Sequence, residues 1–308
     1  MNWESEYVSE LVRCALAEDV GSGDATVLAT IPASAIGHAH IVAKQDLICA
    51  GLPMAKAVFR ALDPTMQIEF RAADGQFVAK GSDLLHLDGA ARAILTGERT
   101  ALNFLAHLSG IATLTHKFVE RLTGTNTRIR DTRKTTPGLR LLEKYGVKMG
   151  GGTNHRIGLY DAVLLKENHI ALAGGVKQAL GQAHSYTALH ARPSAMTAYE
   201  ETEPPSRTLG TPLPVQIEVR NTEELSEAIQ AGADSVLLDN MTVAEARDAV
   251  VIARKLRANV LVEVSGGITL ENARAYAETG ADFLSSGSLT HSAPAADLSL
   301  LVDNIVDK

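Results

Sequence analysis

The segment from residue 128 to residue 156 carries eight basic residues and only two acidic ones, in a chain whose formal net charge is -7. Within it, Arg133 and Lys134 are adjacent, and His155 and Arg156 directly follow three glycines. Arginine binds carboxylates and phosphates through paired charged hydrogen bonds, each contributing about 1.5–3 kcal/mol. A solvated surface face would also explain these bases, so the residues elsewhere in the chain must decide between a surface and an anion site.

Acidic residues end two short apolar runs of the type expected for buried parallel strands. Glu218 lies near the end of Val215–Val219, and Asp239 ends Ser235–Asp239. A carboxylate in such a place is costly without a cation, which leaves two interpretations open. The two acids either pair with Lys or Arg, or they position Mg²⁺ and sugar hydroxyls. The sequence has no Cys/His cluster with zinc-like spacing.

Glycine-containing turns follow two later apolar runs, at Ser265–Gly267 and Ser286–Gly287. Glycine lets backbone N–H groups approach an anion, and the late loops of α/β barrels are the usual phosphate seat. The three glycines at 150–152 do not form a dinucleotide-binding fingerprint, because their spacing differs from G-x-G-x-x-G and no strand directly precedes them.

The elements that must position these residues differ between the two parts of the chain. An amphipathic helix over residues 3–17 and three short strands predict a small antiparallel sheet with helices. These strands are expected at His38–Ala43, Met66–Phe70 and Asp83–Leu87. A helix is expected from Glu98 to Leu122, with an interruption near Ser109-Gly110.

The second part alternates apolar runs with helices, which predicts a parallel βα repeat. The expected strands are Val163–Lys166, Val215–Val219, Ser235–Asp239, Leu261–Val264 and Phe283–Ser286, besides the Arg128–Arg130 run. Thr242–Glu245 has the capping-box pattern that starts a helix, and the proline-rich residues 181–214 predict a long surface loop. Because the strand ends of an α/β barrel converge on one mouth, the polar residues that end these runs should meet there.

Composition excludes several classes of protein. Hydrophobic residues make up 45% and charged residues 21%, as in a globular protein, and no apolar segment approaches the ~18–20 residues that cross a bilayer. The acidic net charge argues against general nucleic-acid binding. Only Cys14 and Cys49 are present, which excludes a disulfide framework, and the first ten residues lack the apolar core of a secretory signal. We therefore expect a cytoplasmic protein that does not associate with membranes.

Three strings of residues strongly resemble the quinolinate phosphoribosyltransferase family. They are D-T-R-K-T-T-P-G-L-R from Asp131, G-G-G-T-N-H-R-I-G-L from Gly150 and L-L-K-E-N-H from Leu164. The resemblance spans nearly the whole chain except residues 181–214. It implies a pentosyltransferase of NAD biosynthesis that converts quinolinate and phosphoribosyl pyrophosphate, with Mg²⁺, to nicotinate mononucleotide, pyrophosphate and CO₂.

The resemblance also implies roles for individual residues. Those that match quinolinate-binding positions are Arg133, His155, Arg156 and Lys166. Catalytic positions that handle ribose, pyrophosphate and Mg²⁺ are matched by Lys134, Glu218 and Asp239, the last two reaching the metal through Mg–phosphoribosyl pyrophosphate. On the phosphate side lie Ser265, Gly266, Gly267, Ser286, Gly287 and His291. Arg99 matches a position that enters the partner's site, which implies a homodimer, and Gln216 replaces an acid that the family often has.

The implied fold is α/β, with an N-terminal α/β sandwich domain over residues 1–112 and an incomplete (open) α/β barrel catalytic domain over 113–288. The tail, residues 289–308, would pack back on the first domain. Three alternatives for function remain open: a relative associated with molybdenum transport, a barrel aldolase that uses Lys166 as a Schiff-base amine, and a non-catalytic binder of phosphorylated metabolites. The intact T-R-K-T-T-P-G and K-E-N-H strings argue against the first.

Overall fold

The computed structural model describes residues 1–189 and 212–306, which form two compact units. The first unit comprises Met1–Leu114, Lys148–Gly151 and Ala293–Lys308, and the second comprises Thr115–Val147 and Gly152–Ser292. The sequence predicted domain boundaries after residues 112 and 288, and in the structure the chain passes from one unit to the other after residues 114 and 292. The excursion of residues 148–151 into the first unit has no counterpart in the predicted division.

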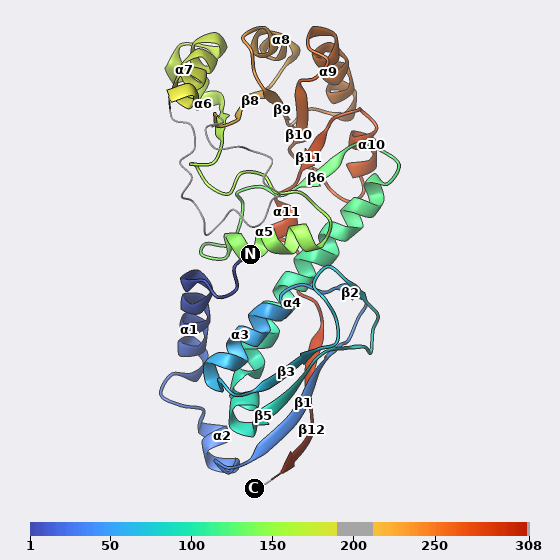
Figure 1. The fold of residues 1–308 in the computed structure, drawn as a ribbon. Helices are drawn as coiled ribbons and strands as arrows, with labels where there is room; N and C mark the ends of the chain where they lie inside the picture. Colours follow the sequence, from blue (N-terminus) through green and yellow to red (C-terminus); the bar gives the residue numbers. More distant parts are fainter. Residues whose placement is uncertain (190–211, 307–308) are drawn as a thin grey trace. The chain divides into compact units, whose positions relative to one another are not determined.

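The first unit is built on a four-stranded antiparallel sheet of order β12-β1-β5-β3, in agreement with the small sheet predicted from sequence. The strands are β1 (Ile36–Ala43), β3 (Gln67–Phe70), β5 (Asp83–Ala90) and β12 (Leu298–Val306). The strands β2 (Leu47–Ile48) and β4 (Phe77–Val78) form a separate pair. The unit also holds the helices α1 (Glu6–Val20), α2 (Ala25–Thr30) and α3 (Leu52–Leu62) (Figure 1).

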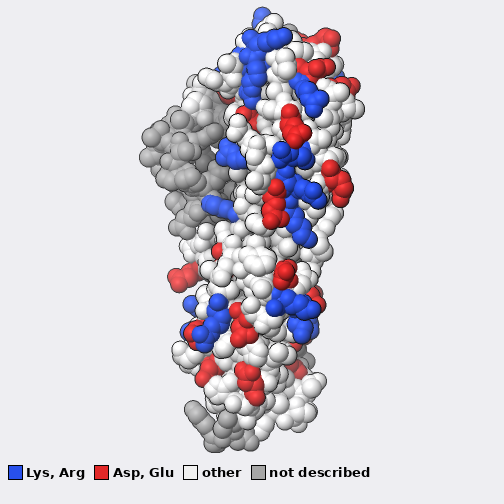
Figure 2. Space-filling view, turned by 90° about the vertical axis from the view of Figure 1, so that its right-hand side faces the viewer, with Lys and Arg blue, Asp and Glu red and all other residues white. Residues whose placement is uncertain are grey.

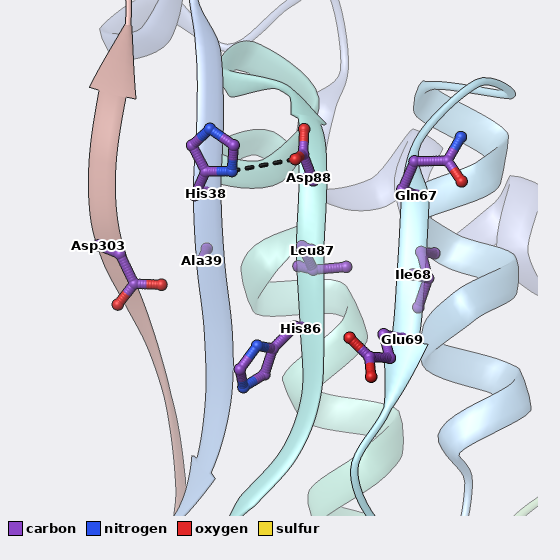
Figure 3. Close-up of a pocket in the computed structure, with 9 residues that line it drawn as sticks. All are labelled: His38, Ala39, Gln67, Ile68, Glu69, His86, Leu87, Asp88 and Asp303. Carbon is purple, nitrogen blue, oxygen red and sulfur yellow. Dashed lines mark ion pairs between the residues drawn. The ribbon is translucent and has the colours of Figure 1, made fainter.

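A cavity of about 370 Å³ lies on this sheet, between side chains of all four strands (Figure 3). His38 and Asp88 form an ion pair across it, with 3.1 Å between Nδ1 and Oδ2. The cavity is lined by His38, Ala39, Gln67, Ile68, Glu69, His86, Leu87, Asp88 and Asp303. It contains none of the residues that the sequence singled out for chemistry.

Helix α4 (Ala91–Leu122) runs without a break through residues 109 and 110, so the predicted interruption is wrong. A Cβ atom on Gly110 would lie only 2.1 Å from the carbonyl oxygen of Pro294, and the Ser109 hydroxyl bonds the backbone of Ala50. Both residues therefore serve close packing inside the first unit. Although α4 is 32 residues long, neither it nor any other described helix is long and apolar enough to cross a membrane.

In the described part of the chain, the second unit contains a sheet of six parallel strands in the order β6-β11-β10-β9-β8-β7. They are β6 (Arg128–Arg130), β7 (Val163–Leu165), β8 (Val215–Val219), β9 (Ser235–Asp239), β10 (Leu261–Ser265) and β11 (Phe283–Ser285). The helices are α5 (Arg140–Met149), α6 (Glu167–Ala173), α7 (Val176–Leu189), α8 (Thr222–Gln230), α9 (Val243–Leu256), α10 (Ala273–Ala277) and α11 (Ser288–His291). Because β6 and β7 end the order, the sheet is an open α/β barrel, as expected (Figure 1).

Local sequence signals explain how the helices of this unit begin and end. The predicted capping box is present: the Thr242 hydroxyl accepts from the Glu245 amide, and the Glu245 carboxylate accepts from the Thr242 amide. The predicted loop over residues 181–214 is wrong for its first part, because α7 continues to Leu189 with buried residues at helical spacing. Residues 190–211 of that prediction lie outside the described residues.

Candidate active site

The strands of the second unit end together at one edge of the sheet. The register pairs Arg130 with Ser285, Ser285 with Ser265, and Ser265 with Asp239, across β6, β11, β10 and β9. Parallel strands in register carry the residues that follow them to the same edge, which is where barrel enzymes keep their chemistry. The structure therefore gathers the loops after these strands at one mouth.

Glu218 and Asp239 face the same side of the sheet on neighbouring strands. Glu218 is opposite Leu237, which lies two residues before Asp239, and side chains two apart share a face. The Lys166 ammonium is 3.0 Å from Glu218 Oε2, so the pairing interpretation holds for this acid. Half of the Lys166 side chain is exposed, at 51%, which leaves the ammonium accessible to a ligand. Asp239 accepts a hydrogen bond from the Asn240 side chain at 2.8 Å.

Arg133 and Arg156 place two guanidinium groups close enough to repel each other. Burial lowers the pKa of Arg156, and the charge of Arg133 lowers it further, against the opposing effect of Asp161. Arg156 donates to the carbonyl of Ala162 at 3.0 Å, whereas its buried Nε has no hydrogen-bond partner among the described residues. A bound anion would relieve both the repulsion and the unsatisfied donor.

A buried ion pair fixes the loop that carries His155. Lys144 and Asp131 have side-chain exposures of 2% and 0%, and the ammonium donates to the carboxylate. Lys144 also donates to the His155 carbonyl at 2.9 Å, and Asp131 accepts from the His155 amide at 2.8 Å. Burial raises the pKa of Asp131 to about 6, a rise that the Lys144 ammonium limits. The pair thus holds both backbone polar groups of one site residue.

The His155 ring enters a polar network beneath the mouth. Its Nδ1 is 2.7 Å from the Arg156 amide nitrogen, and its Nε2 is 3.0 Å from Gln216 Oε1. Gln216 donates to the Glu263 carboxylate at 3.0 Å, and Arg130 reaches the same oxygen at 3.3 Å. Glu263 is 1% exposed, so this network is inside the barrel.

Lys134 lies against the turn after β11. A Cβ atom on Gly287 would be 2.9 Å from Lys134 Cδ and 3.1 Å from the His291 ring. The Thr290 hydroxyl donates to the Lys134 carbonyl at 2.8 Å, which fixes the two loops together. Ser286 is already engaged, because its hydroxyl donates to the Ile268 carbonyl. Three of the predicted residues, Lys134, Gly287 and His291, therefore meet.

The turn after β10 requires glycine. Gly266 has φ +97°, and a Cβ atom there would lie 2.2 Å from Asn240 Oδ1. Gly267 also has a positive φ, +61°, with open space around it. Successive glycines of this kind leave backbone groups accessible to an anion beside Ser265.

Arg99 belongs to the first unit, where it lies on α4 with an exposed side chain. Its predicted entry into the site of a partner subunit stays a prediction. On the face drawn in Figure 2, basic and acidic side chains are interspersed. That face does not have the continuous basic surface that nucleic-acid binding favours.

The fold and the site define an open α/β barrel whose mouth combines arginines, lysines, two carboxylates and glycine turns, as suits small polyanions. The chain matches the N-terminal domain of quinolinate phosphoribosyl transferase over residues 24–109 and the C-terminal domain over residues 111–301. The chain belongs to this family, as the sequence strings predicted.

Curated relatives agree over almost the full length. The chain is 39% identical over 287 residues to the probable nicotinate-nucleotide pyrophosphorylase [carboxylating] of Synechocystis sp., covering 93% of this chain and 90% of that protein. It is 39% identical over 304 residues to the enzyme of that name from Mycobacterium leprae, covering 96% and 98%. The solved nicotinate-nucleotide pyrophosphorylase of Francisella tularensis is 40% identical, with a TM-score of 0.85 and coverage of 97% and 96%.

Sequence reasoning missed three residues that support the site: Asp131, Lys144 and Glu263. Asp131 and Lys144 counted only as charges of the basic segment, although Asp131 directly follows β6. Glu263 interrupts the apolar run of β10, and a single acid within a buried strand was a signal in itself.

Proposed function

We propose that this protein transfers the phosphoribosyl group of phosphoribosyl pyrophosphate to quinolinate and releases CO₂, with nicotinate mononucleotide and pyrophosphate as the other products. The observation that carries the proposal is the closeness of Arg133 and Arg156, with a buried guanidinium donor that lacks a partner within the described residues. Quinolinate presents two carboxylates on adjacent ring atoms, and forked guanidinium groups match that geometry. The names of the relatives support the same reaction.

The dicarboxylate would be bound by Arg133, Arg156 and Lys166. Lys166 would exchange its contact with Glu218 for a substrate carboxylate, since its side chain is half exposed. His155 would act beside them, although both of its ring nitrogens already contact protein groups. These contacts orient the pyridine nitrogen, which is a weak nucleophile, toward the anomeric carbon of the sugar.

Glu218 and Asp239 fit a Mg²⁺ ion most of whose ligands are supplied by the substrate and by water. Among residues 1–189 and 212–306, no group of three or more His, Cys, Asp or Glu side chains could hold a metal. Mg²⁺ is commonly held by one or two carboxylates together with substrate phosphates and water. The ion, when bound with phosphoribosyl pyrophosphate, supplies positive charge that stabilises the leaving pyrophosphate.

The remaining chemistry needs charge and position more than proton transfer. Lys134, beside Gly287, would stabilise the departing pyrophosphate, and the carboxylates of Glu218 and Asp239 would favour the developing positive charge on the sugar. Once its nitrogen is quaternary, the positive charge of the ring stabilises the electron pair left on the adjacent carbon when the carboxylate leaves as CO₂. That carbon then takes a proton from water to give nicotinate mononucleotide, so no dedicated acid or base of the chain is required for the step.

The aldolase alternative is not favoured by the geometry. A Schiff-base lysine must reach the substrate carbonyl with its nitrogen, and here the Lys166 nitrogen is engaged by the Glu218 carboxylate at 3.0 Å. Borohydride treatment in the presence of a carbonyl substrate should therefore leave Lys166 unmodified.

The test is to incubate purified protein with Mg²⁺, phosphoribosyl pyrophosphate and either quinolinate or nicotinate, and to measure CO₂ and pyrophosphate. We expect quinolinate to give both products in equal amounts, and nicotinate to give neither. Binding of phosphoribosyl pyrophosphate without release of pyrophosphate would instead identify a non-catalytic binder.

We also propose that the protein is a homodimer in which Arg99 enters the partner's site. Arg99→Met and Lys134→Met should each be inactive alone, because each removes a cation from every site. After the two variants are mixed and allowed to exchange subunits, activity should reappear, since one site per mixed dimer then has both residues. No recovery in dimers shown to have exchanged would exclude this role of Arg99.

A further inference from the structure

The hydrogen bonds of His155 fix where its proton lies. A backbone amide can only donate, so Nδ1, 2.7 Å from the Arg156 amide nitrogen, must accept and carries no proton. A neutral imidazole has one donor and one acceptor. Nε2 therefore carries the proton and donates it to Gln216 Oε1, 3.0 Å away.

Gln216 is oriented from its other side by Glu263. Its Nε2 donates to Glu263 Oε2 at 3.0 Å, which turns the amide oxygen toward His155. Glu263 is in turn fixed by Arg130, whose guanidinium reaches the same oxygen at 3.3 Å and stacks 3.3 Å from the centre of the Phe283 ring. Donation thus runs from His155 to Gln216 and from Gln216 to Glu263, and Glu263 accepts from Arg130 as well.

A second proton on His155 would place two donors face to face. Protonated Nδ1 would point at the Arg156 N–H, and the bond between them would break. Burial lowers the pKa of His155, and the charges of Arg130 and Lys144 lower it further, against Glu263 and the bond to Gln216. These effects agree with the geometry of the hydrogen bonds.

We propose that Gln216 is a positioning residue that holds His155 as the neutral Nε2–H tautomer, so that Nδ1 fixes the backbone of Arg156 at the mouth of the barrel. His155 then adds no charge to the site, and the substrate carboxylates are bound by cationic residues alone. This step rests on the proposed function only for the identity of the ligand that Arg156 binds.

An amide at position 216 does what a carboxylate cannot. It accepts from His155 and donates to Glu263 at once, whereas a glutamate would set two carboxylates side by side in a buried layer. In Gln216→Glu, a proton on His155 or between the two acids would relieve the repulsion. Gln216→Met keeps the size of the side chain and removes both hydrogen bonds.

The first test reads the tautomer in the ligand-free protein by nitrogen NMR of ¹⁵N-histidine-labelled samples, with His155→Asn to assign the signals. At pH 7.5 we expect one protonated and one unprotonated ring nitrogen, with the proton on Nε2. Gln216→Glu should move both nitrogens toward the doubly protonated pattern. Gln216→Met leaves the ring without its contact at Nε2, so that it can turn away from the Arg156 amide, and should give a mixture of tautomers. The exposed Gln230→Met on α8 is the matched control and should change nothing.

The second test separates positioning from general stability by steady-state kinetics. Gln216→Met should raise the KM for quinolinate roughly ten-fold, as expected when one charged contact is misplaced, with a smaller change in the KM for phosphoribosyl pyrophosphate. A proton on Nδ1 in the wild-type protein, or unchanged ring signals in both Gln216 variants, would overturn the proposal. If the wild-type protein does not turn over quinolinate, the proposed function fails while the tautomer result still stands or falls by itself.

Discussion

Replacing Lys144 by methionine should destabilise the second unit by about 3–5 kcal/mol, the range for breaking a buried ion pair from one side. Asp131 is fully buried and would lose its cation, and the His155 carbonyl would lose a donor that is 2.9 Å away. The unsatisfied carbonyl alone accounts for about 1–3 kcal/mol of that range. Methionine has nearly the length of the lysine stem, so little of the loss would come from a cavity.

The loss should depend on pH in a defined direction. The pKa of Asp131 is raised to about 6 in the folded protein against an ordinary value of 3.8, so the folded state holds a proton that the unfolded state has lost. Stability from this group therefore falls as the pH rises through that window. Without Lys144 the pKa rises further, so the variant should lose more stability relative to wild type at pH 8 than at pH 5.

The measurement is urea denaturation followed by circular dichroism at both pH values, with hydrogen exchange of a peptide around His155 to localise the effect. Arg13→Met is the matched control, since Arg13 and Glu10 form an exposed pair of 2.7 Å whose loss should leave the stability nearly unchanged. If Lys144→Met is within about 1 kcal/mol of wild type at pH 8, or its deficit is larger at pH 5, the buried pair does not support the site in the way we describe.

Three further perturbations test the site. In steady-state assays, Arg133→Met should lower the rate of quinolinate turnover by roughly 10²–10³, as for loss of one preorganised charge. The control Arg247→Met, at an exposed arginine, should leave the rate unchanged. Near-normal turnover by Arg133→Met would show that Arg133 does not bind quinolinate. Gly266→Ala should lower the melting temperature and raise the KM for phosphoribosyl pyrophosphate, because φ is +97° and the new Cβ would meet Asn240; unchanged values would contradict this. Because the pKa of His155 is lowered in the folded protein, its contribution to stability is fully present above about pH 6.5 and is lost as the pH falls. His155→Asn should therefore reduce the slope of unfolding free energy against pH by up to about 1.4 kcal/mol per pH unit. Parallel plots for the variant and the wild type would refute this.

The strands of the barrel could be predicted because a strand that is buried on both faces appears in the sequence as a short continuous run of apolar residues. Val215–Val219 and Ser235–Asp239 have the predicted bounds for this reason. Helix α4 shows the opposite case. A Ser-Gly pair can either interrupt a helix or provide close packing within a continuous one, and the local sequence does not distinguish the two. Gly110 is required by the backbone of Pro294, a contact that exists only once the tail has returned to the first unit.

In the site as well, the residues at the mouth of the barrel could be predicted from the sequence, whereas the contacts in the layer beneath it could not. Arg133 and Arg156 were predicted because bases concentrated at strand ends are visible in one segment. The deeper contacts join β6, β8 and β10, so they depend on the register of strands far apart in the sequence. That register puts Gln216 and Glu263 on the same inward face, where their hydrogen bonds determine the protonation of His155. The charges that we propose to bind ligand are therefore local features of the sequence, whereas the buried polar layer beneath them is assembled only in the folded barrel.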